Sequence, residues 1–582
     1  METVLQLPDL LTPILQHFRV LPPNSDSDSG DNYPHFWRDA LTSNQEKRTT
    51  LYRLALTNKA ISQIALPILW STLGGVAPLL GLIPGAEFSA AHGTWALNRG
   101  PLCEKDLLRF EQAARMVKHI TILTKAGPRW GFQFKPFSDG QSFIFFEISR
   151  SLGNRPLLPS LQSLCVDACC DYASLLLVNT LKHVDISSAR LEDEATPAVQ
   201  ELLSLLPTRA PLLEELYICC ALSEGNLRDV LSLEYLQKLT LDFEESLWPV
   251  NHQKRHQFLK DLDARLPRLR KLDLGTLLED NDHKISPWLE PGLVNYHFPS
   301  LENLAFSGGD DYLAKVLLRL RGVGLKSLVF LNSEPHSGVR HLAVDEAEAQ
   351  EIEKFSAYKA MLILGEQHFR TLTRLEINGL RTENFHPGDL DPLFRISGMK
   401  HLDFHYARNV QIDDELISKM ASSWPHLETL RLYSDPTSTC PTLASIEMFA
   451  RHCPNLRRLS LDLDPGVVPL EDTQTILPLK HLTLFSVLSD ARIGDDDRVS
   501  AIAKFLSKCF PALMFAFVEP SWDTQQAFGE LGTWSSVFDR VLQDKDAKIT
   551  ERLRNVFSPP QTFPKIDFVI ADGVGGSFSI PL

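Results

Sequence analysis

Apolar residues recur along most of this chain in the hexapeptide pattern L-x-x-L-x-L, with conservative replacements. The clear copies span residues 161–166, 181–186, 213–218, 236–241, 269–274, 301–306, 325–330, 372–377, 399–404, 427–432, 456–461 and 479–484, with weaker copies at 117–122 and 513–518. The last two apolar positions lie two residues apart, so they point to one face of a strand. Such a strand cannot bury its apolar face alone, and the pattern therefore predicts stacked repeats.

Stretches of helical character separate the hexapeptides, as at 196–206, 256–266, 413–424 and 442–453. Several of them end in a proline directly before the next copy, as in LPRL, FPSL, WPHL and CPNL. Proline cannot continue a helix, so the helix ends there and the next strand turn begins. The alternation predicts an α/β architecture with short parallel strands. The long insertion at 336–369 is expected to add a helix on the helical side.

The N-terminal part follows a different pattern, with two apolar stripes at helical spacing. The first stripe consists of Leu7, Leu11, Ile14, Leu15 and Phe18. Within it, Thr12 is a candidate N-cap and Pro13 a favoured first helical residue, so the helix is expected to begin or kink there. The second stripe predicts an apolar helix over 51–73, with Asn58 as a candidate cap, and consists of Leu54, Ile61, Ile64, Ala65 and Ile68.

Two resemblances follow from these patterns. Residues 115–520 resemble the leucine-rich-repeat family, although the spacing between the repeats is irregular. The stretches LPDLLTPIL and LALTNKAISQIALPILWSTL resemble the F-box family as it occurs in fungal proteins. The residues that carry the second resemblance are Leu54, Leu56, Lys59, Ile64, Ala65, Leu66, Pro67, Leu69 and Trp70. The stretch 106–123 is similar to the bridge between F-box and first repeat in such proteins.

The resemblances imply an α/β fold with a short N-terminal helical F-box, followed by an irregular leucine-rich-repeat solenoid. Its parallel strands would lie on the concave face and its helices on the convex face. The expected divisions are an F-box at 1–73, bridge helices at 74–115, repeats at 116–520, and a C-terminal cap and tail at 521–582. The polar insertion at 19–48 is poor in apolar residues, and we expect a mobile loop that bulges into solvent.

The F-box resemblance also implies a function. The chain would be a non-catalytic substrate-recognition subunit of a Skp/cullin/F-box E3 ubiquitin ligase, docked on a Skp-type adaptor and through it on a cullin. The repeats would bind a protein target for ubiquitination. The implied adaptor-facing residues are Leu7, Pro8, Leu11, Ile14, Leu15, Leu66, Pro67 and Trp70. Two alternatives stay open: these side chains only pack the helices together, or the chain is a leucine-rich-repeat scaffold unrelated to ubiquitination whose helices cap the solenoid.

Strand alternation also names candidate target-binding residues, because side chains between the buried apolar positions point outward. The candidates are Tyr217, Lys271, Asp273, Arg374, Glu376, His401, Asp403, Arg431, Tyr433 and Phe485. The aromatic ones would anchor a partner. The charged ones would recognise a patterned partner or, alternatively, only neutralise one another as surface ion pairs.

Composition narrows the remaining classes. The formal net charge of -15 disfavours nucleic acid as a partner. No secretory leader or membrane span is recognisable, so the expected location is cytoplasmic, nuclear or both. The cysteines lack zinc-site spacing, and RGVGLKS at 321–327 lacks the order of a phosphate-binding loop. No catalytic set can be assigned, and we expect neither enzyme activity nor a metal or cofactor.

Overall fold

The computed structural model describes residues 8–16, 18, 47–89, 94–98, 102–122, 141–153, 155–187, 196–220, 222–241, 252–275, 296–308, 310–320, 323–332, 360–366, 369–378, 387–405, 412–432, 440–466, 478–487, 493, 496–518 and 533–543. The chain divides into two compact units, Met1–Val339 and Arg340–Leu582. Each unit combines parallel strands with helices, which confirms the predicted α/β repeat fold.

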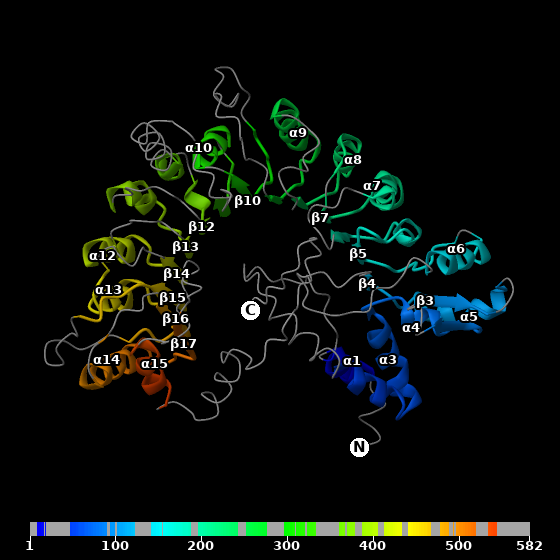
Figure 1. The fold of residues 1–582 in the computed structure, drawn as a ribbon, viewed down its shortest axis with the longest axis horizontal. Coiled ribbons are helices and arrows are strands. Elements are labelled where there is room, and N and C mark those ends of the chain that lie inside the picture. The colour runs from blue at the N-terminus through cyan, green and yellow to red at the C-terminus, as the bar shows by residue number, and fades with distance from the viewer. Residues whose placement is uncertain are drawn as a thin grey trace, which may run out of the picture. The chain divides into compact units, whose positions relative to one another are not determined.

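The first unit stacks its parallel strands in chain order (Figure 1). They are β1 (Thr72–Leu73), β4 (His119–Ile122), β5 (Ser163–Asp167), β6 (His183–Ser187), β7 (Glu215–Cys219), β8 (Lys238–Leu241), β9 (Lys271–Leu274), β10 (Asn303–Gly308) and β11 (Ser327–Asn332). The register advances by one repeat at each step, so that Leu216 pairs with Leu239 and Leu239 with Leu272. Equivalent leucines therefore stack into one continuous core.

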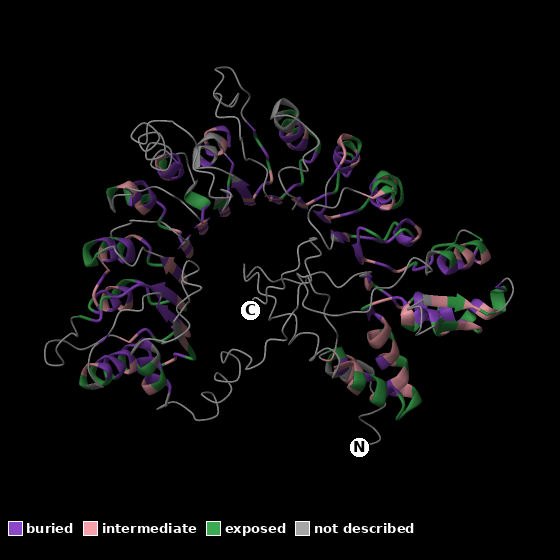
Figure 2. Ribbon diagram, in the orientation of Figure 1, coloured by how far each residue is buried: buried purple, intermediate pink, exposed green. Residues whose placement is uncertain are grey.

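Helices of the first unit lie along one face of these strands (Figure 1). They are α6 (Gln141–Ser151), η3 (Ala173–Leu176), α7 (Pro197–Arg209), α8 (Glu224–Val230), α9 (His252–Arg265) and α10 (Asp310–Arg319). Local sequence explains where they begin: the Thr196 side chain accepts a hydrogen bond from Val199 N, and Ser223 forms a capping box with Asn226. Buried residues gather along the strands and on the sides of the helices that face them (Figure 2).

The N-terminal helices precede this sheet and join it directly. α1 spans Pro8–Gln16, residues 47–55 are helical, and α3 spans Lys59–Trp70. The prediction of one helix over 51–73 is wrong, because residues 56–58 interrupt it and Asn58 accepts a hydrogen bond from Ala60 N as the N-cap of α3. The helical segment also includes residues 47 and 48, which the predicted insertion had contained.

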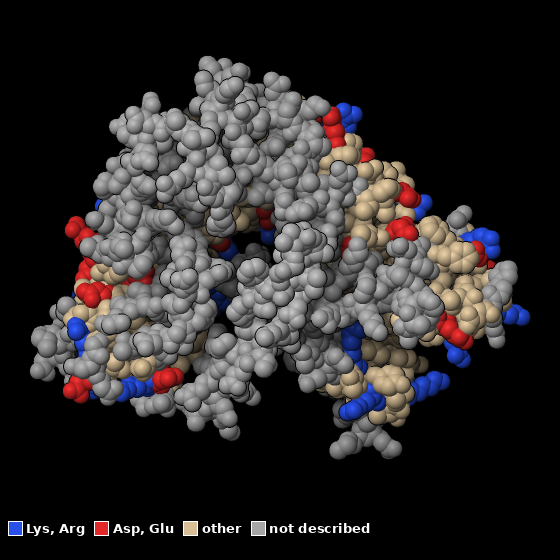
Figure 3. All heavy atoms as spheres, viewed as in Figure 1, with Lys and Arg blue, Asp and Glu red and all other residues tan. Residues whose placement is uncertain are grey.

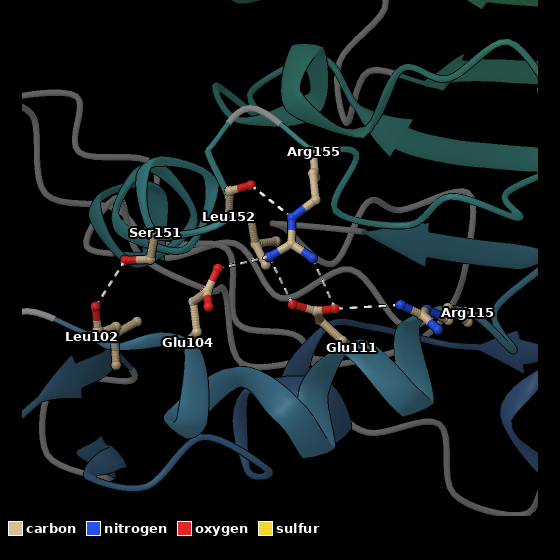
Figure 4. Close-up of polar contacts among 7 residues, drawn as sticks. All are labelled: Leu102, Glu104, Glu111, Arg115, Ser151, Leu152 and Arg155. Atoms are coloured by element: carbon tan, nitrogen blue, oxygen red, sulfur yellow. Dashed lines mark hydrogen bonds and ion pairs between the residues drawn. The ribbon is translucent and has the colours of Figure 1, made fainter.

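Residues 74–115 form a bridge of mixed structure. It contains α4 (Ala77–Leu80), an antiparallel hairpin of β2 (Ala86–Ser89) and β3 (Thr94–Leu97), and α5 (Glu104–Ala114). The sequence did not predict the hairpin. Arg155 follows α6 and forms ion pairs with Glu104 and Glu111 of α5, while Ser151 of α6 donates to the Leu102 carbonyl (Figure 4). These contacts connect α5 with the end of α6.

The second unit repeats the same design. Its strands, in spatial order, are β12 (Arg374–Asn378), β13 (His401–His405), β14 (Thr429–Leu432), β15 (Arg458–Leu461), β16 (Leu484–Val487) and β17 (Phe515–Val518). Its helical elements are residues 360–366, η6 (Phe369–Thr371), η7 (Pro387–Arg395), α12 (Asp414–Ser423), α13 (Ser445–His452), α14 (Asp496–Cys509) and α15 (Thr533–Gln543). Residues 360–366 supply a helix within the long insertion, whose residues 336–359 lie outside the described part of the chain.

A ladder of backbone hydrogen bonds joins each repeat to the next. In most of the hexapeptides, the N–H groups of the two residues after the first leucine or methionine donate to one carbonyl of the preceding repeat. Lys182 N and His183 N, for example, donate to Gln162 O at 2.8 and 3.0 Å. The same arrangement recurs in the second unit, where Arg457 N and Arg458 N donate to Glu428 O. The polar backbone is thereby satisfied next to the buried leucines.

The strand register corrects one predicted repeat. The sequence LKHLTLFSV contains two overlapping copies of the pattern, at 479–484 and 482–487. β16 uses the second copy: Leu459 pairs with Phe485, and Thr483 N and Leu484 N donate to Arg457 O. The second frame places Phe485 in the core against the rings of Phe510 and Phe538.

Gly365, in the helical residues 360–366, lies against η7, where a Cβ atom would come within 2.6 Å of the Pro392 carbonyl carbon. Overpacking of this kind costs about 1–3 kcal/mol. We expect Gly365→Ala to lower the free energy of unfolding by about that amount in urea denaturation. Gly388→Ala is a matched control in η7, because a Cβ there meets nothing within 4 Å. Equal stability of the two variants would contradict this packing.

Candidate interaction surfaces

The N-terminal helices pack around a small apolar cluster. Its buried members are Leu15, Leu51, Ala55, Ile61 and Ala65, and its partly buried members are Leu11, Phe18, Leu54, Ile64, Leu66, Ile68 and Leu69. Leu15 is only 3% exposed, so its predicted adaptor-facing role is wrong: its surface is used within the cluster. Leu54 and Ile64 pack against the same core, as the packing alternative expects.

The other predicted adaptor-facing residues have varied positions. Pro67 is exposed, whereas Leu11, Leu66 and Trp70 are half-buried. Leu7 lies outside the described residues, as do the side chains of Pro8 and Ile14.

Two large apolar side chains that were not predicted as a site point away from the cluster. Tyr52 is 54% exposed and Leu56 is 69% exposed. Leu56 directly follows the helical residues 47–55, and its N–H donates to the Tyr52 carbonyl at 3.2 Å, so the two residues lie one turn apart. Tyr52 directly follows the buried Leu51, and Leu56 directly follows the buried Ala55. Large apolar residues one position after the buried stripe are the sequence signal that could have identified this surface. The N-terminal helices thus present an outward apolar surface.

Basic side chains border this surface. Residues 47–73 contain Lys47, Arg48, Arg53 and Lys59 and no acidic residue, in a chain whose net charge is -15. In Figure 3, Lys and Arg atoms border uncharged surface at the place of α1 and α3. The segment is therefore a locally basic, partly apolar surface on an acidic protein, and it favours an acidic partner.

The same helices are held firmly on the repeat sheet. Ser71 directly follows α3, and its carbonyl accepts hydrogen bonds from Lys118 N and His119 N at 2.9 Å each. Arg48 donates from Nη2 to the Thr72 carbonyl at 2.8 Å, and burial lowers the pKa of its guanidinium. The N-terminal helices thus form the first step of the backbone ladder, with no flexible linker between α3 and β1.

On the strand face of the first unit, an ion network crosses three strands. Glu215 on β7 lies 3.2 Å from His183 Nδ1 on β6 and 2.8 Å from Lys238 Nζ on β8. The hydrogen bond with His183 is the main cause that lowers the pKa of Glu215 to about 2; burial opposes it, and Lys238 lowers the pKa further. The predicted residues Tyr217 on β7 and Lys271 and Asp273 on β9 are half-buried here.

On the strand face of the second unit, the structure brings five predicted residues together on adjacent strands. Arg374 and Glu376 form an ion pair at 3.0 Å within β12, and Arg431 of β14 pairs with Asp403 of β13 at 3.5 Å. These pairs agree with the expectation that charges on this face neutralise one another. Burial lowers the pKa of the His401 imidazole; Glu428 opposes this, and the cations Arg374, Lys400 and Arg458 lower the pKa further.

Two predicted anchors do not contribute to this face. Phe485 is completely buried, because the frame of β16 turns it into the core, so its predicted binding role is wrong. Tyr433 lies outside the described residues.

Metal and thiol chemistry are not indicated in the described part of the chain. There, no group of His, Cys, Asp or Glu side chains could hold a metal ion. Burial raises the pKa of the Cys170, Cys220, Cys453 and Cys509 thiols to about 12, which suits packed thiols rather than reactive ones. Among the same described residues, no helix has the length and apolar character to cross a membrane.

Comparison with known proteins adds little to this picture. No protein-family model and no curated protein matches the chain. Among solved structures, the chain is similar to Rad7 from yeast in its complex with Elc1, at 16% identity and a TM-score of 0.37 over 67% of this chain and 90% of that one. It is also similar to the leucine-rich-repeat protein LegL7 from Legionella pneumophila, at 13% identity and a TM-score of 0.24 over 60% of this chain and 98% of that one. At these values, the similarity carries no conclusion about partners or activity.

The Glu215 network makes stability depend on pH. Because folding lowers the Glu215 pKa from 4.5 to about 2, its stabilising contribution is present above pH 4.5 and is lost as the pH falls toward 2. We expect Glu215→Gln to be less stable than wild type near neutral pH, with the difference shrinking through that window in denaturation experiments. Glu201→Gln, on the exposed side of α7, is the matched control. A difference that stays constant down to pH 2 would rule out this role.

Proposed function

We propose that the chain is the non-catalytic substrate-recognition subunit of a Skp/cullin/F-box E3 ubiquitin ligase. The N-terminal helices bind a Skp-type adaptor, which connects the chain to a cullin, and the strand faces bind a protein target. The chain raises the effective concentration of target lysines near ubiquitin carried by another subunit. On this proposal, the chain acts in the cytoplasm, the nucleus or both.

The observation that carries this proposal is the outward apolar pair Tyr52 and Leu56 within a basic helical surface. Large aromatic and aliphatic side chains that stay exposed on a helical cluster are typical of a protein-binding surface. The F-box resemblance of the surrounding sequence supports a Skp-type adaptor as the partner. The absence of acidic residues from 47–73 favours an acidic surface on that adaptor.

The connection between the helices and the sheet supports the same proposal. A substrate receptor is effective when the target is held at a constant position relative to the ligase. The hydrogen bonds from Lys118 and His119 to the Ser71 carbonyl, together with Arg48 on Thr72, fix α3 to the first strands. A target bound by the first unit would therefore keep its position relative to the adaptor.

The second candidate function is a repeat scaffold unrelated to ubiquitination. One observation favours it: α3 continues directly into β1, the first strand of the sheet, so the helices can cover the end of the core. The two functions use opposite sides of the cluster. A cap depends on buried residues such as Leu51, whereas an adaptor site depends on exposed ones such as Leu56.

We expect purified full-length chain to bind a purified Skp-type adaptor, and Tyr52→Glu combined with Leu56→Glu to weaken binding at least about tenfold, because two apolar contacts are lost. The measurement is an adaptor pull-down followed by calorimetry. The matched control combines Gln16→Glu with Gln63→Glu, which adds the same charge at exposed positions of α1 and α3.

The outcomes separate the two functions. Because Tyr52 and Leu56 are exposed, their replacement should leave the melting temperature nearly unchanged. Absence of adaptor binding by the wild-type chain would refute the receptor function. A double variant that keeps full adaptor binding would rule out Tyr52 and Leu56 as the adaptor surface, and a cap function would instead depend on buried residues such as Leu51.

A further inference from the structure

The helix α6 carries aromatic side chains on two opposite sides. It lies on the helical side of the first unit's strands (Figure 1). On its inner side, Ile148 is buried, and the Phe145 ring stacks on the Tyr172 ring with 4.3 Å between the ring centroids. On its outer side, Phe143 is 64% exposed and Phe146 is 51% exposed. The inner residues account for the packing of α6, so the core does not require the outer aromatic pair.

The outer residues of α6 form one stripe. Phe143, Phe146 and Arg150 follow one another at steps of three and four residues, which places them on one side of the helix. This spacing is typical of the seam between two packed helices. Glu147 pairs with Arg150 at 3 residues' separation, with 2.9 Å between Oε2 and Nη2. The guanidinium is therefore held next to the aromatic pair.

The charge along this stripe is balanced. The charged residues of α6 are Glu147 and Arg150, one acidic and one basic. An excess of one sign would favour a partner of opposite charge, and a cluster of basic residues would favour an anionic bilayer. α6 offers neither. A stripe that has one charge of each sign beside an apolar pair is instead complementary to a copy of itself that runs in the opposite direction.

We infer that α6 packs against α6 of a second copy of this chain, antiparallel about a two-fold axis that passes between Phe146 and Glu147. The axis falls close to the middle of the helix, so the two copies overlap along nearly its full length. The inference does not depend on the proposed function.

This arrangement makes each contact twice, as a two-fold interface requires. Phe146 of one copy meets Phe146 of the other next to the axis. Phe143 and Arg150 are equally far from the axis, so Phe143 of each copy faces Arg150 of the other, and a guanidinium over an aromatic ring is favourable. Glu147 of each copy also lies within one turn of Arg150 of the other. Apolar and charged contacts therefore favour the same alignment.

The size of the contact indicates a reversible dimer. A buried aromatic side chain contributes about 150–250 Å². At the exposures of Phe143 and Phe146, two copies together bring roughly 450 Å² of aromatic surface to the contact. Stable interfaces bury about 1,200–2,000 Å² in total. We therefore expect a dimer whose population depends on concentration, with a dissociation constant in the micromolar range.

The test is sedimentation velocity of the full-length chain at about 1–100 µM. We expect the weight-average mass to rise with concentration toward that of two chains. Phe143→Ser combined with Phe146→Ser should weaken dimerisation at least about tenfold, because the aromatic contact is lost. The matched control combines Leu212→Ser with Met514→Ser, which removes two side chains that are 49% and 47% exposed elsewhere. It should change the dissociation constant by less than about twofold.

Charge reversal tests the two-fold geometry directly. Arg150→Glu gives α6 two acidic residues, and Glu147→Arg gives it two basic ones, so each variant should weaken its own dimer at least about fivefold. An equimolar mixture of the two variants should dimerise within about threefold of wild type, because each cross-pair again joins opposite charges. A folding defect in either variant would not produce this recovery.

α8 offers the control for charge reversal. Its Arg228 forms an exposed ion pair with Glu224 of the same helix at 3.1 Å, as Arg150 does with Glu147 on α6. Arg228→Glu changes the net charge by the same amount as Arg150→Glu. It should change the dissociation constant by less than about twofold. Thermal melts check the folding of every variant, and if the Ser pair melts early, the charge mixture decides.

Several results would overturn the inference. They are a wild-type chain that stays monomeric at 100 µM, an equal loss in the Leu212 and Met514 control, and a charge mixture that does not dimerise. Binding of the monomeric chain to phosphatidylserine vesicles that needs the aromatic pair would assign this pair to lipid instead. Tyr52→Glu combined with Leu56→Glu should leave the dimer intact; loss of the dimer in that variant would place the contact on the N-terminal helices.

Discussion

The backbone ladder between repeats is the interaction on which both units depend. Within each unit, one carbonyl of a repeat accepts two N–H groups of the next, as Gln162 O does from Lys182 and His183, and this fixes the register in which the leucines stack. No repeat can satisfy its own backbone or bury its own strand. Since the inward positions and the backbone carry this requirement, the outward side chains are left to differ from repeat to repeat.

The N-terminal helices obey the same constraint, because Ser71 supplies the first carbonyl of the ladder. Their inner side is committed to packing, with Leu51 fully buried, whereas Tyr52 next to it is mostly exposed. A capping role and a docking role are therefore compatible in one segment. The fold needs the buried residues such as Leu51. The large exposed side chains Tyr52 and Leu56 do not contribute to the core, so packing does not account for them.

Much of the fold followed from the period-two leucine pattern, and its failures have physical causes. LKHLTLFSV satisfies the pattern in two frames, and only the contacts of Phe485 with Phe510 and Phe538 decide between them. The interruption at 56–58 depends on the cap at Asn58: the sequence correctly marked Asn58 as a candidate cap, but the continuous apolar stripe still favoured a single helix. The candidate surfaces were less predictable, because an apolar stripe does not show which side chain, such as Leu15 or Leu56, the tertiary packing buries.

The charged side chains on the strands of the second unit were equally hard to interpret from the sequence. A sequence places Arg374, Glu376, Asp403 and Arg431 on one face, but it does not show which charges neutralise which. Once Glu376, Asp403 and Glu428 are paired across or along strands, their basic partners contribute little net field to the surface. Specificity on such a surface is decided by the charges that remain after internal pairing, and these become visible only when the register of every strand is known.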